Sequence, residues 1–332
     1  MRQNIILGAF LALGVLCVGQ AVLAGDDPVE HCQLQVAACG SKGQFDEEKC
    51  QKLAARIDEC KAGTNPGTVC RLTLANITPT QTSVGRQAAL CKSRKLEARA
   101  ARTDFKDGLS RYLLKPDNLV PTVLGPAGAE GSGHRFYITD HHHLSYALLQ
   151  AKLEMDKAVF ACIIADKQDY DMEEFWDYLV RHHFVWLEDD QGRAITTTQL
   201  RQITAIDQLV DNPYRTWSAW VRTSCGYLKY GEDCLGDKPR KDDLAAANVE
   251  NPPPYFMEFR WADYLAVNLP ELRSLDFGNT SDAALRQNLT KALDLAQGKQ
   301  AFIEDLPGFN DPDDPLFPLK PISFANGCEK ED

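Results

Sequence analysis

Cysteine is the residue that most constrains the fold of this chain, because ten of its eleven cysteines follow an apolar N-terminal segment. Arg2 precedes an apolar run from Ile5 to Val18, and Val22-Leu23-Ala24 fits the small-residue rule of signal peptidase. We therefore expect residues 1–24 to be a signal peptide and the protein to be secreted or periplasmic. An uncleaved membrane anchor is the alternative, but the run is short and ends in small residues. We expect no membrane span after cleavage.

Disulfide bonds are the expected use of an even number of cysteines in an exported chain. Two short helices are expected at about 28–39 and 46–61, joined by a glycine-containing turn. Folded back antiparallel, this hairpin would pair Cys39 with Cys50 and Cys32 with Cys60. Cys225 and Cys234 lie nine residues apart and could close a small loop. A zinc site is the alternative, but the close Cys-x-x-Cys pairs typical of zinc are absent.

The charge of the chain excludes a generally basic nucleic-acid binder. The formal net charge is −11, and it becomes −12 when Arg2 leaves with the signal peptide. The segment from Arg86 to Lys115 differs, because it holds nine Lys and Arg residues and only three acidic ones. A solvated helix face is one interpretation, and a local docking surface for phosphates is the other.

The pattern of apolar residues predicts an α+β fold with a small mixed sheet. Strands are expected at 69–77, 120–124, 136–139 and 158–164, the last buried on both faces. Pro121 makes the second of these a short or edge strand. Helices are expected at 83–112, 141–152, 172–182, 197–209, 213–224, 255–267 and 281–297. We divide the chain into a Cys-rich helical hairpin (25–68), a core (69–170), a helical extension (171–300) and an irregular tail (301–332).

A run of histidines is the strongest candidate for chemistry. Asp140-His141-His142-His143 follows a predicted strand and opens a predicted helix, with Asp140 placed to cap it. The free N–H groups of a first helical turn favour an anion, and imidazoles can transfer protons or bind a metal. Consecutive helical residues point about 100° apart, so at most two of these histidines can face one ligand. The alternative is that they pack and cap without taking part in catalysis.

Other charged residues could complete such a site. Arg86 and Lys92 of the basic segment could stabilise developing charge, and Arg215, just after a capped helix start at Asn212-Pro213, could reach a phosphate. Glu258 could act as a base or a metal ligand. The metal candidates are therefore His141, His142 and Glu258, with a divalent ion as the expected cofactor if there is one.

Several segments resemble a known family. The strand-turn-helix from Tyr137 to His143 resembles a signature box of the ParB/sulfiredoxin superfamily, in which the corresponding turn holds the phosphates of a nucleotide. More closely, the chain resembles the putative ParB-like nuclease family over roughly residues 72–270. The segments that carry this likeness are 77–81 with 84–85, 140–143, 174–176, 211–215 and 258–263. The resemblance implies a ParB/sulfiredoxin-like core.

The departures from that family limit what the resemblance implies. Sulfiredoxins need a cysteine in this turn, and partitioning proteins that hydrolyse CTP carry arginines where this chain has His143 and Leu144. The first hypothesis is therefore a hydrolase acting on a phosphodiester or nucleotide, with a small phosphate-containing ligand or nucleic acid as partner. The alternatives are a non-catalytic envelope scaffold that binds an anionic ligand or a protein, and a nucleotide-dependent phosphotransferase.

Overall fold

The computed structural model describes residues 27–40, 47–101, 108–127, 134–154, 157–229, 234, 255–312 and 318–329. The expected signal peptide, residues 1–24, lies outside these ranges. Within them, no helix combines the length and the apolar character that a membrane span requires.

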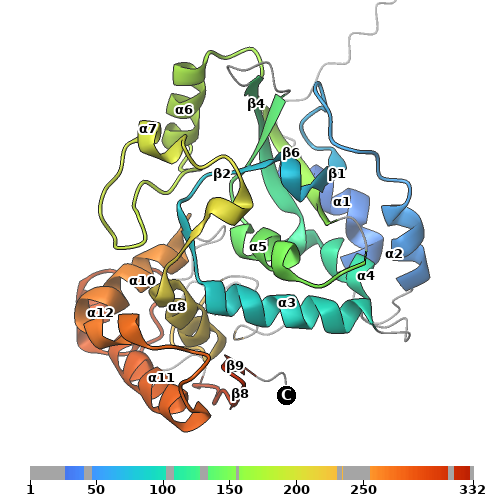
Figure 1. Cartoon of the computed structure of the whole chain (residues 1–332). Helices are drawn as coiled ribbons and strands as arrows, with labels where there is room; N and C mark the ends of the chain where they lie inside the picture. The colour runs from blue at the N-terminus through green and yellow to red at the C-terminus, as the bar shows by residue number, and fades with distance from the viewer. Residues whose placement is uncertain are drawn as a thin grey trace, which may run out of the picture.

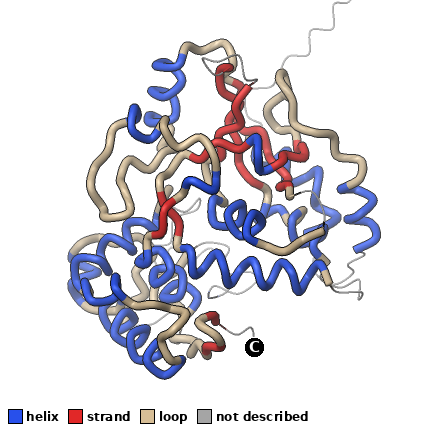
Figure 2. Tube along the Cα trace, in the orientation of Figure 1, coloured by secondary structure: helices blue, strands red, loops and turns tan. Residues whose placement is uncertain are grey.

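A five-stranded mixed sheet forms the centre of the fold (Figure 2). Its strand order is β1-β6-β4-β5-β2, with β6 parallel to β4 and β5 parallel to β2, and with antiparallel pairing elsewhere. The strands are β1 (Val69–Thr73), β2 (Ile77–Pro79), β4 (Val120–Ala127), β5 (His134–Ile138) and β6 (Ala158–Asp166). The α+β class with a small mixed sheet is therefore confirmed.

The position of β4 differs from the prediction of an edge strand, which is wrong. β4 lies between β6 and β5 in the sheet. Pro121 is tolerated in this central strand because β5 pairs with β4 only from Thr122 onward. The carbonyl of Pro121 still accepts a hydrogen bond from the amide of Thr139 at 2.9 Å. β6, expected to be buried on both faces, lies between β1 and β4 and is mostly buried.

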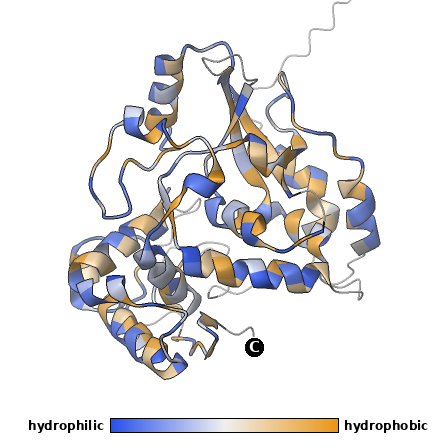
Figure 3. Cartoon of the chain, in the orientation of Figure 1, coloured by the Kyte–Doolittle hydropathy of each residue, from blue (hydrophilic) through white to orange (hydrophobic). Residues whose placement is uncertain are grey.

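Helices cover both faces of the sheet. On β5, Phe136 and Ile138 join the main core with α3 (Arg86–Ala100) and α5 (His142–Gln150), whereas Tyr137 points to the opposite face. There it meets Phe175 of α6 (Met172–Arg181) at a ring-centroid distance of 4.6 Å. Figure 3 shows hydrophobic residues along the central strands, and mixed hydrophobic and hydrophilic residues along α3.

Three predicted helices are shorter than expected. The second helix of the N-terminal hairpin, expected to reach residue 61, ends at Ala54. The predicted helix 83–112 begins only at Arg86, because Ser83–Val84 form β3, which pairs in parallel with β7 (Val210–Asp211). The predicted helix 197–209 ends after α7 (Thr197–Leu200), and the Gln208 side chain then accepts the amide hydrogens of Thr204 and Ala205. The remaining short elements of this part are α4 (Leu109–Leu113), η1 (Leu74–Asn76), η2 (Pro116–Asn118) and η3 (Ile206–Gln208).

Disulfides attach the N-terminal helices to the sheet. α1 (Pro28–Gly40) and α2 (Glu47–Ala54) are joined by Cys39–Cys50, and Cys225–Cys234 is also present, so these two predicted pairs are confirmed. The predicted Cys32–Cys60 pair is wrong. Cys32 instead bonds Cys162 of β6, because α1 packs against that strand, and Cys60 bonds Cys70 of β1. Such bonds indicate an oxidising, non-cytoplasmic environment.

The C-terminal helices form a second core beside the sheet domain (Figure 1). This core holds Trp217, Trp220 and Trp261, all fully buried. The chain end is less irregular than expected, since β8 and β9 form a hairpin that Cys328 attaches to Cys91 of α3. The elements are α8 (Pro213–Thr223), α10 (Met257–Asn268), η5 (Pro270–Ser274), α11 (Asp282–Ala296), α12 (Lys299–Ile303), β8 (Phe324–Ala325) and β9 (Cys328–Glu329).

Candidate functional site

The turn between β5 and α5 is built differently from the prediction. Asp140 was the expected N-cap, but His141 occupies that position, with left-handed φ and ψ of 60° and 24°. The Asp140 carboxylate accepts the amide hydrogen of His141 at 2.6 Å, so it cannot serve the first helical turn in the usual way. A left-handed conformation is uncommon for a residue with a side chain and is often found at functional sites.

His142 is a buried hydrogen-bond acceptor. Its side chain is 3% exposed, and its Nε2 accepts the amide hydrogen of Thr80, just after β2, at 3.0 Å. Burial lowers the pKa of His142 to about 3, although the nearby Asp140 acts in the opposite direction. The ring is therefore neutral at physiological pH. Because an amide can only donate, Nε2 is unprotonated and the proton lies on Nδ1.

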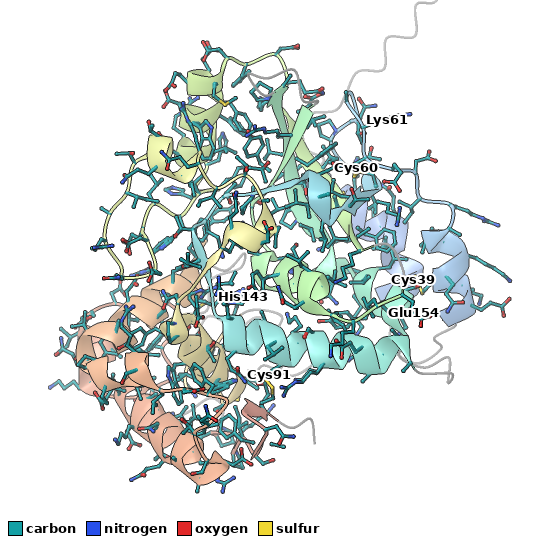
Figure 4. All side chains as sticks on the ribbon, in the orientation of Figure 1. Cys39, Cys60, Lys61, Cys91, His143 and Glu154 are labelled. Atoms are coloured by element: carbon teal, nitrogen blue, oxygen red, sulfur yellow. A yellow bond between two sulfur atoms is a disulfide. The ribbon has the colours of Figure 1, made fainter. Side chains whose placement is uncertain are left out.

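His143 makes the equivalent bond to another segment. Its Nε2 accepts the amide hydrogen of Gly85 at 2.9 Å, at the start of α3 (Figure 4). Burial and the charges of Arg215 and Lys92 hold the pKa of His143 well below its usual range. There is no room for a side chain at Gly85, because a Cβ there would lie 2.6 Å from the amide nitrogen of Thr216.

These contacts divide the three histidines into two kinds. The Nε2 lone pairs of His142 and His143 are used to join α5 to the segment between β2 and α3. They cannot also take a proton or a metal while those bonds are intact. His141 makes neither of these contacts and is partly exposed. Its position at the left-handed turn before α5 makes it the candidate for contact with a ligand.

Arg215, in the first turn of α8, is the most unusual charged residue of the site. It is 6% exposed, and its Nε and Nη1 have no hydrogen-bond partner among the residues that the structure describes. Its guanidinium carbon lies 4.0 Å from the ring centroid of Phe259. Burial lowers the pKa of Arg215, while the charge of Glu258 opposes that effect. A buried cation with unused donors can accept an anion without breaking an existing hydrogen bond.

Glu258, at the start of α10, is paired with two cations of its own. Its Oε1 accepts from Nη1 of Arg222 and from Nζ of Lys229, the latter at 2.7 Å. Burial would raise the pKa of Glu258, but Lys229, Arg222 and Arg215 hold it well below the usual range. The Glu258 carbonyl accepts from Ser218 Oγ at 2.9 Å, which fixes α10 against α8.

Asp140 is electrostatically connected to the same group of residues. Burial acts to raise the pKa of Asp140, but the charges of His141 and Lys229 outweigh that effect, so the pKa is lowered overall. The Asp140 carboxyl group is therefore ionised near neutrality. We call Asp140, His141, Arg215, Arg222, Lys229 and Glu258 the Arg215 cluster. Its three basic side chains, Arg215, Arg222 and Lys229, outnumber its two carboxyl groups.

The two predicted residues of α3 differ in what their side chains reach. Lys92 is within electrostatic reach of His143. Arg86 instead donates to the carbonyl of Leu209 at 2.9 Å and lines a separate cavity of about 400 Å³ with Tyr146 and Arg273. The prediction took both residues from one basic segment, but their side chains have different surroundings.

A metal centre is not assembled by the candidate ligands. In the described part of the chain, no group of three or more His, Cys, Asp or Glu residues is close enough to hold an ion. His142 uses its Nε2 elsewhere, and Glu258 is held by Arg222 and Lys229. The described donors therefore do not form a metal site on their own.

Three residues near the site were not predicted from the sequence. Arg222 lies seven positions after Arg215, two turns along one face of α8, and this spacing could have revealed it. Lys229 and Phe259 gave no local signal, because each reaches Glu258 or Arg215 only through the packing of α10 against α8.

The fold and the site define a ParB-like domain: a small mixed sheet in which a strand and turn deliver histidines to the start of a helix. Residues 70–234 match the family model described as "Putative ParB-like nuclease". Residues 70–234 therefore form a domain of the putative ParB-like nuclease family. The matched segment contains every member of the Arg215 cluster except Glu258.

The chain resembles the crystal structure of protein Atu1540 from Agrobacterium tumefaciens, with 24% sequence identity and a TM-score of 0.49. That alignment covers 73% of this chain and 97% of the other. No curated protein matches the chain.

Proposed function

We propose that this chain is an exported ParB-like protein whose Arg215 cluster binds the phosphate of a nucleotide or a nucleic-acid phosphodiester and hydrolyses it. The observation that carries the proposal is the guanidinium of Arg215, whose Nε and Nη1 have no hydrogen-bond partner among the described residues. This guanidinium is buried beside two histidines that are held neutral. An anionic oxygen would supply the missing acceptors. The excess of cations favours negative charge at the same place.

The proposed chemistry assigns a role to each group. Water attacks phosphorus and its proton passes to His141, while the bond from phosphorus to the leaving oxygen breaks. Arg215 stabilises the charge that develops on the non-bridging oxygens. Asp140 would orient His141, as a carboxylate orients a general base. The leaving oxygen then receives a proton from the imidazolium or from water.

A non-catalytic binding role is the second candidate. It is favoured by the hydrogen bonds of His142 and His143, which make these residues structural. On this view the protein is an envelope scaffold that holds an anionic ligand at Arg215 without transforming it.

The test combines binding and turnover. Hydrolysis of bis(p-nitrophenyl) phosphate, nucleotides and single-stranded DNA would be measured for the mature protein with Mg²⁺ and with a chelator. Binding of a non-hydrolysable phosphodiester would be measured by calorimetry. Arg215→Met should abolish both, and His141→Ala should abolish hydrolysis alone. Arg260→Met is the matched control, since Arg260 is exposed on α10 and bonds the carbonyl of Asp305.

The outcomes separate the two candidates. Binding that Arg215→Met removes, with no turnover of any substrate, supports the scaffold. Equal binding in wild type and Arg215→Met, or no binding in either, contradicts both.

A further inference from the structure

Two carboxyl groups meet at the contact between α10 and the loop before α7. Glu188 lies in that loop, and Asp263 lies on α10. Both face the backbone of Gly192: a methyl group added there would lie 3.4 Å from Asp263 Oδ1 and 3.9 Å from Glu188 Oε2. Their side chains are hydrogen-bonded to each other. Because an ionised carboxylate only accepts, such a bond requires a proton on one of them.

The Glu188 side of this contact is linked to the histidine turn. The amide of Trp186 donates to the carbonyl of Thr80 at 3.0 Å, and Thr80 donates its own amide hydrogen to His142. The hydroxyl of Thr82 donates to the carbonyl of Glu188 at 2.9 Å. The segment from 186 to 188 is therefore fixed to the part of the chain that His142 holds.

The Asp263 side is linked to Arg215. Phe259 lies four residues, about one helical turn, before Asp263 on α10 and so shares its face. The Phe259 ring stacks on Trp186 with 4.8 Å between the ring centroids. The guanidinium carbon of Arg215 lies 4.0 Å from the centroid of the same Phe259 ring. The carboxyl pair thus lies one turn beyond the aromatic contact that supports Arg215.

The charges around the pair favour a shared proton. Burial and the negative charge of Glu188 raise the pKa of Asp263 to about 7, against a smaller opposing effect from Arg215. Burial and the charge of Asp189 likewise act to raise the pKa of Glu188. Asp189 itself is paired with Arg193 at 2.7 Å, so that arginine is committed elsewhere. Arg273 donates to the carbonyl of Asp190, the residue after Asp189, at 3.3 Å.

We propose that Glu188 and Asp263 are positioning residues, which share one proton and so hold α10 against the Trp186 segment with Phe259 beneath Arg215. The inference rests on the proposed function in so far as Arg215 is the anion-binding group. When the proton leaves, two carboxylates face each other, the contact loosens and Arg215 loses its support. Phosphate binding at Arg215 therefore requires that the Glu188–Asp263 pair hold its proton.

The experiment uses dimethyl phosphate as the probe, because this phosphodiester keeps a single charge throughout the range tested. Its dissociation constant would be measured by calorimetry from pH 5.5 to 8.5 for the wild type and for Asp263→Asn. Wild-type affinity should fall above pH 7 by up to about tenfold per pH unit, as expected when binding needs one proton. Asp263→Asn should bind equally at every pH, since an amide donates to Glu188 without titrating.

Two further variants make the comparison specific. Glu188→Gln should likewise make the affinity for dimethyl phosphate independent of pH, because the glutamine amide can donate to the Asp263 carboxylate without titrating. Asp189→Asn, which neighbours the pair without belonging to it, should keep the wild-type slope. A slope in Asp263→Asn equal to that of the wild type would overturn the proposal.

Thermal unfolding over the same pH range keeps the test independent of phosphate binding. If dimethyl phosphate binds at no pH, the proposed function fails, but the shared proton is still testable. Wild-type melting temperature should then fall relative to Asp263→Asn from pH 5.5 to about 7 and level off above that. In this interval the folded protein keeps a proton on the pair, whereas the unfolded chain has already lost it. Parallel melting curves for the two proteins across that range would contradict the shared proton itself.

Discussion

The amide of Gly85 donates its hydrogen to Nε2 of His143 at 2.9 Å, across 58 positions of the chain. On its other side, Gly85 lies so close to Arg215 and Thr216 that a Cβ would overlap their backbone atoms. One glycine thus joins the starts of three helices, α3, α5 and α8. The location of Arg215 depends on this junction.

His143→Ala should destabilise the protein by about 1–3 kcal/mol, because it leaves the amide of Gly85 without its acceptor. Urea unfolding followed by circular dichroism measures the loss. His182→Ala is the control, since His182 is exposed at the end of α6 and accepts from no buried amide in the described part of the chain. Equal stability of the wild type and His143→Ala would show that the bond to Gly85 contributes nothing.

Gly85→Ala should be more damaging than its small size suggests. The added methyl would lie 2.6 Å from the amide nitrogen of Thr216, so α3 and α8 must move apart. We expect phosphodiester binding to fall at least tenfold, along with a lower melting temperature. Gly278→Ala is the control, because its methyl would approach only one side-chain oxygen, at 3.3 Å. Unchanged binding in Gly85→Ala would mean that Arg215 does not depend on this junction.

Acid should weaken the fold through His142. Its pKa is about 3 in the folded protein and near 6.5 when unfolded, so the unfolded chain binds the proton more readily between these values. Stability is therefore complete above pH 6.5 and is lost as pH falls toward 3, by at most about 1.4 kcal/mol per unit. Chemical unfolding at several pH values checks this.

His142→Gln isolates that contribution, because a glutamine oxygen can still accept from Thr80 but does not titrate in this range. The difference in stability between wild type and His142→Gln should narrow as the pH falls below 6.5. A constant difference from pH 7 to 4 would contradict the assignment of a neutral, buried imidazole.

The fold was largely predictable because its signals are local. The runs that form β5 and β6 and the capped start of α8 at Asn212 each follow from a few neighbouring residues. The pairing of Cys39 with Cys50 follows equally from a short hairpin. Cys32 was assigned wrongly because its partner, Cys162, lies 130 positions away and is brought near only by the packing of α1 on the sheet.

The site was less predictable because tertiary contacts decide which groups are available. The sequence indicated the histidine run, but not that the amides of Thr80 and Gly85 would use two of its rings. It also could not show that Glu258 would be held by Arg222 and Lys229, which leaves Arg215 with unused donors.

Arg215→Met should separate stability from function. Arg215 is buried with two unused donors, so replacing it by an apolar side chain of similar length removes a desolvated charge. We expect the free energy of unfolding to stay the same or to rise by about 1–2 kcal/mol, while phosphodiester binding is lost. Glu258 keeps Arg222 and Lys229 as partners, so this change leaves no uncompensated carboxylate.

Arg222→Met is the matched comparison on the same helix. It removes a partner of Glu258 and should destabilise the protein, by roughly 3 kcal/mol if Lys229 does not compensate. Urea unfolding of both variants gives the contrast. If Arg215→Met unfolded as easily as Arg222→Met, the guanidinium of Arg215 would be stabilised by the folded protein. Its unused donors would then no longer support a role in anion binding.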